Sequence, residues 1–272
     1  MLNKKYYIFL LLVAGVTLVW SCKKDKNEPK PATGEVYMTK RIAIHENGLS
    51  DTVFISYDEQ HRIKEERAGI SSTVYTYNSD GKLSRSSDLL RIKDLTYENG
   101  VALYATYSYG PTWEPSDTVF LQFNSDGLIS QRTDKSEIRR YTYNSDKRFE
   151  MIVNTYLESY HLGTGDTTRL EWDSKGNVVK ETFLDGSYDR TLTYTYDDKP
   201  NYNKTLHIPY ELLILTEQVG MNYYSANNCT SVKLEMDGNS VTKYINILQY
   251  NINGYPELIN TDTDQIKLFY TY

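Results

Sequence analysis

The side chains that most often carry out catalysis are scattered along this 272-residue chain. None of the four histidines, His45, His61, His161 and His207, has a second histidine four residues away, as a zinc-binding helix would. No Gly-x-Ser-x-Gly elbow or phosphate loop occurs, and Gly163-Thr164-Gly165 lacks the third glycine of a dinucleotide site. The sequence therefore predicts that the protein is not an enzyme and has no catalytic, cofactor-binding or metal-binding residue. A glycosidase-type pair of carboxylates stays an open alternative, because such pairs meet only through the fold.

Carboxylates also cluster in short segments that resemble part of a calcium loop. Two copies are Asn78-Ser79-Asp80-Gly81 and Asn124-Ser125-Asp126-Gly127, and a third is Asp173-Ser174-Lys175-Gly176. An EF-hand supplies its ligands from alternating acidic residues and a closing glutamate, whereas each copy here offers one carboxylate or a neighbouring pair. We therefore interpret the segments as tight turns, in which Asn, Asp and Gly tolerate positive φ.

One residue, Cys22, is placed for covalent modification. Two lysines precede an apolar stretch, residues 6–20, that is shorter than the roughly 20 residues of a membrane span and suits a signal peptide. Val19-Trp20-Ser21-Cys22 is similar to a bacterial lipobox, from which Trp20 departs. We predict a signal peptide over residues 1–21, acylation of Cys22 and a flexible tether over residues 22–35. An ordinary signal peptide cut nearby, with Cys22 incidental, is the alternative.

The elements that would carry any site repeat along the chain. An apolar–polar–aromatic triplet precedes a polar turn and a further apolar residue, as in Tyr75-Thr76-Tyr77 before Leu83 and Leu121-Gln122-Phe123 before Ile129. A period of two places both apolar side chains of a triplet on one face of a sheet. Tyr57 and Tyr77 lie 20 residues apart, about the length of two strands and their turns. The prediction is an all-β fold: a large curved antiparallel meander of repeated hairpins, barrel-like or half-open.

Composition limits the class of partner. The net charge of -6 argues against a nucleic-acid-binding surface, which would be basic. The 26 tyrosines, against 7 phenylalanines, indicate cross-strand packing on a half-solvated sheet, with a sugar-binding aromatic face as the alternative. The second cysteine, Cys229, is expected to be a small buried apolar side chain rather than a nucleophile.

One stretch interrupts the repeat. Asp197-Asp198-Lys199-Pro200 predicts a turn, and residues 205–219 are mostly apolar without a clean strand or helix period, although Pro209 suits a helix start. We predict an irregular or short helical crossover near residues 205–219 that plugs one end of the sheet, before Tyr223-Tyr224 returns to strand. A single β domain is expected over residues 36–272.

Taken in order, these segments resemble a known group. The lipobox at Cys22, the hairpins, Asp197-Asp198-Lys199-Pro200 and Ser225-Ala226-Asn227-Asn228 look like the uncharacterised Bacteroides-type lipoproteins with a domain of unknown function and a porin-like β fold. The hairpins are also similar to the tyrosine-aspartate repeats of large shell-forming bacterial toxins. The resemblance implies a β architecture and a cell-envelope location. It implies no activity, and Cys22 alone is carried over as a functional residue.

The expected function is that of a non-enzymatic lipoprotein anchored to the outer membrane, on its periplasmic or its outer side. It would bind a glycan, a peptide or a protein through a concave or Tyr-rich face. A structural scaffold of the envelope is the alternative, and a hydrolase of envelope polymers is a third. The repeated Asp51-Thr52, Asp117-Thr118 and Asp166-Thr167 resemble O-glycosylation acceptors, or are simply strand starts.

The chain end raises the question of a membrane-embedded barrel. Leu268-Phe269-Tyr270-Thr271-Tyr272 resembles the last strand of an outer-membrane barrel. Charged runs such as Arg62-Ile63-Lys64-Glu65-Glu66-Arg67 interrupt the apolar row that a lipid-facing strand needs. We therefore expect a water-soluble barrel or curved sheet, monomeric, and held at the membrane by its lipid alone.

Overall fold

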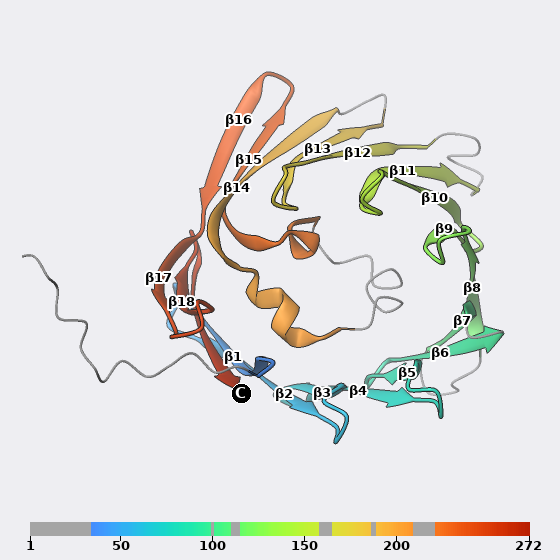
Figure 1. Cartoon of the computed structure of the whole chain (residues 1–272), viewed down its shortest axis with the longest axis horizontal. Helices are drawn as coiled ribbons and strands as arrows, with labels where there is room; N and C mark the ends of the chain where they lie inside the picture. The colour runs from blue at the N-terminus through green and yellow to red at the C-terminus, as the bar shows by residue number, and fades with distance from the viewer. Residues whose placement is uncertain (1–33, 99–100, 110–114, 158–164, 186–188, 209–220) are drawn as a thin grey trace, which may run out of the picture. The chain divides into compact units, whose positions relative to one another are not determined.

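The computed structural model describes residues 34–98, 101–109, 115–157, 165–185, 189–208 and 221–272. They form one 19-stranded antiparallel sheet that curves into a barrel (Figure 1), which confirms the predicted all-β meander. The strands are β1 (Tyr37–His45), β2 (Ser50–Tyr57), β3 (Ile63–Ala68), β4 (Ser71–Tyr77), β5 (Leu83–Ser87), β6 (Arg91–Glu98), β7 (Val101–Tyr109), β8 (Pro115–Phe123), β9 (Ile129–Thr133), β10 (Glu137–Tyr143), β11 (Phe149–Tyr156), β12 (Thr167–Trp172), β13 (Val178–Leu184), β14 (Arg190–Pro200), β15 (Asn227–Met236), β16 (Asn239–Tyr244), β17 (Asn246–Tyr250), β18 (Pro256–Asn260) and β19 (Asp264–Thr271).

Nearly every strand pairs with the strand that follows it in the sequence. This holds from β1 to β16 and again from β17 to β19. The first and last strands also pair, with Arg41 opposite Leu268, so the ring closes there. Among the described strands, β16 and β17 do not pair with each other, and the barrel therefore has one seam.

The two faces of the sheet differ as the alternation predicts. The polar residue of each triplet is exposed on the outer face; these residues are Ser56, Thr76, Gln122, Thr142, Glu171 and Gln249. The inner face carries one continuous apolar cluster, which includes Ile55, Tyr75, Leu121, Tyr141 and Leu170. Burial of this inner face is the main stabilising contribution to the fold. None of the described helices is long and apolar enough to cross a membrane.

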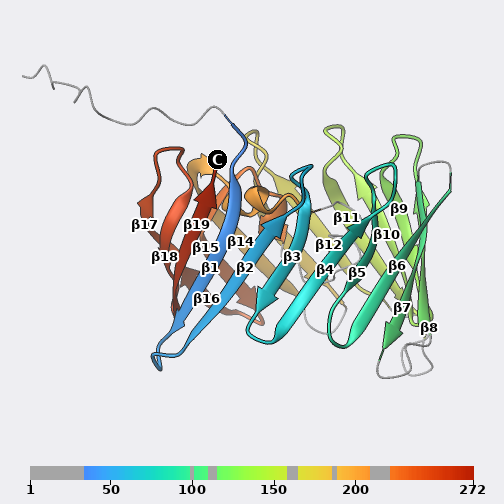
Figure 2. The same ribbon diagram turned by 90° about the horizontal axis from the view of Figure 1, so that it is seen from below.

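The turns that follow the aromatic triplets lie at the same end of the barrel, where β1 begins and β19 ends (Figure 2). In the turn after β4, Asn78 Oδ1 accepts the backbone N–H of Asp80 at 3.1 Å and that of Lys82 at 2.9 Å. Gly81 has φ 79°, a value that glycine adopts without steric cost. The side chains that resembled calcium ligands therefore satisfy the backbone of their own turns.

Tyrosine hydroxyls link each hairpin to the preceding one. Tyr77 Oη donates to the carbonyl of Ile63 at 2.7 Å, next to a register shift between Ser56 and Tyr57 where the β2–β3 ladder is interrupted. The same bond recurs around the barrel from Tyr57, Tyr97, Tyr143, Tyr196 and Tyr270. Phenylalanine cannot make this bond, which gives a reason for tyrosine at these six positions.

Removing one of these hydroxyls should have a measurable cost. We expect Tyr77→Phe to lower the free energy of unfolding by about 1–2 kcal/mol, because it leaves the carbonyl of the fully buried Ile63 without this donor. Urea unfolding followed by circular dichroism measures the loss. Tyr272→Phe, at an exposed position, is the control and should be neutral. Equal effects of the two substitutions would contradict the role assigned to the hydroxyl.

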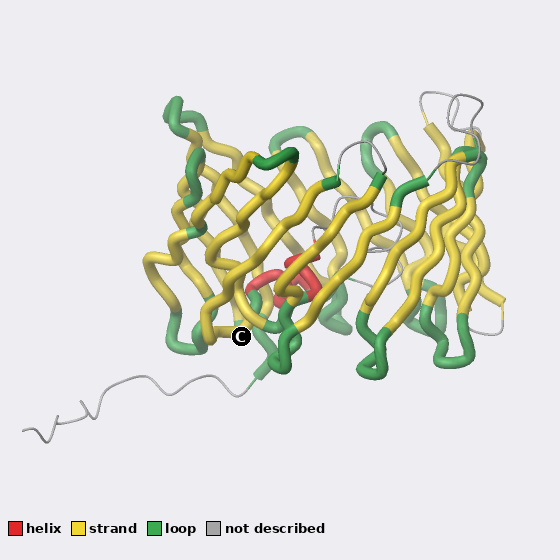
Figure 3. Tube along the Cα trace, turned by 90° about the horizontal axis from the view of Figure 1, so that it is seen from above, coloured by secondary structure: helices red, strands yellow, loops and turns green. Residues whose placement is uncertain are grey.

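The crossover between β14 and β15 folds into the barrel. It contains two short 3-10 helices, η1 (Tyr202–Leu206) and η2 (Met221–Tyr224), which lie inside the ring of strands (Figures 1 and 3). Tyr202, Leu206 and Tyr224 pack against the inner apolar cluster. Part of the predicted crossover, residues 209–220, lies outside the described residues. Two details of the prediction were wrong. The predicted turn Asp197-Asp198-Lys199-Pro200 is the end of β14, and Tyr223 and Tyr224 belong to η2, so that strand resumes only at Asn227.

Candidate functional site

The seam lies where the chain changes its pairing partner. Strand β16 pairs with β15 as far as Tyr244, which lies opposite Ser231, and β17 pairs only with β18. Ile245, between them, donates its N–H to the carbonyl of Thr230 at 2.8 Å. Backbone groups alternate between the two edges of a strand, so Ile247 presents its N–H and C=O to the same edge as Ile245. Among the described residues, no backbone partner meets this edge of β17.

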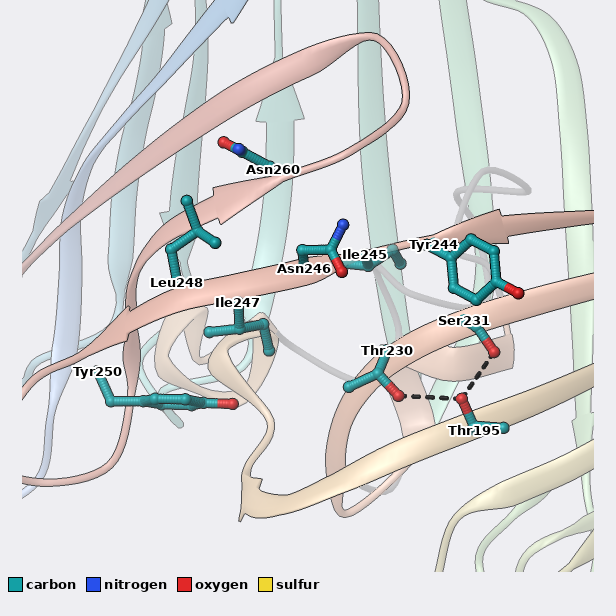
Figure 4. Close-up of a pocket in the computed structure, with 10 residues that line it drawn as sticks. All are labelled: Thr195, Thr230, Ser231, Tyr244, Ile245, Asn246, Ile247, Leu248, Tyr250 and Asn260. Atoms are coloured by element: carbon teal, nitrogen blue, oxygen red, sulfur yellow. Dashed lines mark hydrogen bonds between the residues drawn. The ribbon is translucent and has the colours of Figure 1, made fainter.

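A groove of about 610 Å³ follows the seam (Figure 4). One side of it is polar: Thr195 Oγ1 hydrogen-bonds the hydroxyls of Thr230 at 2.9 Å and Ser231 at 2.7 Å. The other side is built from β16 and β17 and is lined by Tyr244, Ile245, Asn246, Ile247, Leu248 and Tyr250. The groove thus combines hydroxyl and amide groups with apolar side chains, a mixture that suits a polypeptide backbone and its side chains.

Two large side chains beside the open edge of β17 are exposed to solvent. Tyr244 is 58% exposed and Leu248 is 55% exposed. Leu248 is the extra residue of a bulge, because Ile247 lies opposite Ile259 and Gln249 lies opposite Leu258. Natural edge strands are usually blocked by lysine, proline or a covering segment, since an open edge pairs with other chains. Among the described residues, Leu248 is thus a large apolar side chain left exposed beside this edge.

Charged residues gather on the inner wall at β9 and β10, where paired carboxylates could have met. Arg132 Nη2 lies 2.9 Å from Asp134 Oδ2, and Arg132 Nη1 lies 2.5 Å from Glu137 Oε1. Burial acts to raise the pKa of Asp134, but hydrogen bonds from Ser136 and the N–H of Glu137, with the charge of Arg132, hold it below its ordinary value. Catalytic acids have raised pKa values instead. This arrangement is therefore an ion-pair network.

A second buried carboxylate, Asp166, is held nearby. Asn154 Nδ2 donates to Asp166 Oδ1 at 2.6 Å, and the hydroxyl of Tyr156 donates to the other oxygen. The hydrogen bond to Asp166 raises the pKa of Tyr156 to about 12. Asp166 thus joins β11 to the segment before β12, which is a structural role for one of the three repeated Asp-Thr pairs.

The three described histidines lie in two places, one at the rim beside carboxylates and two against the ring of Tyr37. His45 lies at the rim, 2.9 Å from Asp51 and 2.6 Å from Asp264, and hydrogen bonds to these carboxylates raise its pKa. His61 and His207 both contact the ring of Tyr37, whereas His161 lies outside the described residues. Within the ranges that the structure describes, no three His, Cys, Asp or Glu side chains are grouped as metal ligands would be.

Of the two cysteines, Cys229 lies within the described residues and Cys22 does not. Cys229 is buried in the inner cluster, and burial raises the pKa of its thiol to about 11, which confirms the expected apolar role. Cys22 and the predicted signal peptide and tether, up to residue 33, lie outside the described residues, so acylation stays a prediction.

Comparison with solved structures finds limited similarity to two porin-like proteins and to one larger protein. A porin-like protein from Bacteroides uniformis is 10% identical, with a TM-score of 0.49 over 89% of this chain and 99% of that chain. A porin-like protein from Bacteroides vulgatus is 13% identical, with a TM-score of 0.46 over 87% of this chain and 99% of that chain. The fold is similar to these porin-like proteins. TcdB2-TccC3-TEV is 13% identical, with a TM-score of 0.33 over 82% of this chain and 14% of that chain.

Scans against protein-family models and against curated proteins found no match. The likeness therefore concerns the fold alone. The expected lipoprotein family and the expected tyrosine-aspartate repeats stay predictions.

The seam itself was not predicted. Residues 244–250 look like any other repeat, since Leu248-Gln249-Tyr250 is one of the triplets. One signal was present: the stretch from Asn239 to Tyr250 is unusually long for one strand in a chain of short strands, and it contains Asn246, a turn-forming residue, where β17 begins.

Proposed function

We propose that the protein is a non-enzymatic cell-envelope lipoprotein whose barrel captures an extended peptide segment at the seam. The observation that carries the proposal is the open edge of β17 beside the exposed Leu248. A peptide strand added to this edge would satisfy the N–H and C=O of Ile247, and its alternate side chains would contact the groove. The partner is thus an extended, partly apolar segment of another protein.

The experiment selects binders from random ten-residue peptides displayed on phage. The affinity of a selected peptide, labelled with a fluorophore, is then measured by fluorescence polarisation. Leu248→Lys should weaken binding about tenfold, because lysine removes an apolar contact and blocks the edge. Val74→Lys is the matched control: Val74 is exposed on the outer face of β4, which is paired along both edges. Peptide should also slow hydrogen exchange of the N–H of Ile247.

The outcomes separate the proposal from its alternative. A peptide that binds both lysine variants equally, without protecting Ile247, would place its site elsewhere. If no peptide is enriched on the natural protein relative to a parallel selection on the Leu248→Lys variant, the structural-scaffold function is favoured instead.

The envelope location rests on the leader sequence and Cys22. We expect Cys22→Ser to abolish incorporation of radiolabelled palmitate and to move the protein from the membrane fraction to the soluble fraction. Cys229→Ser, which changes the remaining cysteine, should keep the label. Labelling of the Cys22→Ser variant would show that acylation occurs at another residue.

A further inference from the structure

A separate pocket of about 150 Å³ lies between the barrel wall and η2. Four aromatic side chains and two cations line it: Tyr143, Phe149, Trp172, Tyr224, Lys147 and Arg148. A cavity of about 150 Å³ holds one ring of the size of benzene. Aromatic walls bind flat or ring-shaped ligands, and two cations at the rim favour a ligand with a negative charge.

The repeat differs at this pocket. The turn position before the next strand is glycine in four hairpins, with φ 79° at Gly81, and is a larger residue in two others, His61 with φ 60° and, here, Lys147 with φ 61°. The next strand begins with Phe149, where the other hairpins have an aliphatic residue such as Ile129 or Val178. The triplet beside it ends in Trp172, where the other triplets end in tyrosine or phenylalanine.

Contacts between the lining side chains fix the shape of the pocket, which suits a ring-shaped ligand. Trp172 Nε1 donates to the carbonyl of Phe149 at 2.6 Å, which fixes the plane of the indole. The rings of Tyr143 and Phe149 lie 5.0 Å apart at 31°, and those of Phe149 and Tyr224 lie 5.3 Å apart at 79°. The pocket is thus formed by rigid side chains from two hairpins and from the inserted helix.

Among the described residues, each of the two cations has an exposed carboxylate as its ion-pair partner. Lys147 Nζ lies 3.1 Å from Asp126, and Arg148 Nη1 lies 3.6 Å from Asp146; both carboxylates are more than half exposed. Such surface pairs contribute about 0–1 kcal/mol. A carboxylate of a ligand can therefore replace them at little cost. The Arg148 guanidinium also lies 5.5 Å from the centroid of the Trp172 ring, at the side of the pocket.

We propose that this pocket binds a single six-membered ring that carries a carboxylate, with the ring against Trp172 and the carboxylate on Lys147 and Arg148. Acidic sugars and aromatic acids share this chemistry. The site is distinct from the seam, and the proposal does not depend on the peptide-binding function.

The test uses the chain from Cys22 onward with Cys22→Ser and Trp113→Phe, which leaves Trp172 as its one tryptophan. Its fluorescence is titrated with glucuronate, benzoate and glucose. We expect saturable binding of glucuronate, benzoate or both, and at least tenfold weaker binding of glucose. Preference for glucuronate identifies a sugar site, and preference for benzoate identifies an aromatic-acid site. Equal binding of glucose, or no binding of either acid, overturns the proposal.

A variant with opposite effects on affinity and stability sharpens the test. Lys147→Gly restores the glycine of the repeat, so it should raise the urea midpoint while it weakens binding of the acid at least tenfold. His61→Gly is the matched control, because His61 holds the same turn position, with φ 60°, in another hairpin. Unchanged affinity in Lys147→Gly, or an equal loss in His61→Gly, would show that the pocket is not the site.

Discussion

Arg132→Met is expected to lower the free energy of unfolding by about 3–5 kcal/mol. The guanidinium is buried and contacts both Asp134 and Glu137. Methionine approximates the size of the arginine stem, so packing is largely kept. The buried carboxylate of Asp134 loses its counter-charge, and Glu137 loses one of its two described arginine partners but keeps Arg139 at 3.0 Å. Urea unfolding at pH 7, followed by circular dichroism, measures the effect.

The control is Arg85→Met, which breaks an exposed pair with Asp94 and should cost at most about 1 kcal/mol. Neutralising the two carboxylates with Asp134→Asn and Glu137→Gln in the Arg132→Met background should recover part of the loss. If Arg132→Met is no more harmful than Arg85→Met, the network does not contribute to stability as argued.

The loss of unfolding free energy caused by Arg132→Met should also depend on pH. Since the pKa of Asp134 is lowered in the folded protein, its stabilising contribution is present above its unfolded pKa of about 4 and is lost as the pH falls through the folded value. Protonation also removes the charge that Arg132 compensates. We therefore expect the difference between the natural protein and Arg132→Met to be smaller at pH 3 than at pH 7.

Asn228→Ala has the second large expected effect, a loss of about 2–4 kcal/mol. Asn228 is 1% exposed; its Oδ1 accepts the N–H of Tyr202 at 2.9 Å, and its Nδ2 donates to Asp197 Oδ2 at 2.9 Å. Alanine leaves the start of η1 without this acceptor. Urea unfolding gives the global loss, and limited proteolysis should show faster cleavage between β14 and β15.

The matched control for this substitution is Asn239→Ala. Asn239 is exposed in β16, and its one described side-chain bond, to the carbonyl of Asp237, is 3.4 Å long. Asn239→Ala should change neither the free energy of unfolding nor the rate of proteolysis. Unchanged proteolysis in Asn228→Ala would mean that other contacts suffice to hold the inserted helices.

Much of the wall could be predicted because it depends on local pattern. Alternation in Tyr75-Thr76-Tyr77 determines which side chains point inward, and Asn78 determines the turn. The crossover was recognisable from the loss of the repeat after Pro200. The motif Ser225-Ala226-Asn227-Asn228 contributed only to a resemblance, although its side chains prove to hold the inserted segment.

The candidate sites could not be predicted, because they depend on register and on distant partners. The seam requires that β15 and β17 diverge after the bond between Ile245 and Thr230. The contact of Trp172 with Phe149 spans 23 residues, and the charge network depends on which side chains share the inner wall. Periodicity gives the face of a residue but neither its neighbours across the sheet nor the place where pairing stops.

The succession of neighbouring strands has a consequence for how the chain reaches this structure. Almost all ladders join segments adjacent in sequence, so the contact order is low for a β protein and hairpins can form one after another. Ring closure is the exception, since it brings Thr39 to Phe269, 230 residues away. The loop-closure entropy of that step is small if the intervening hairpins are already formed. Closure between β1 and β19 should therefore be the last event of folding, and a nascent chain that lacks β19 would keep an open, adhesive edge on β1.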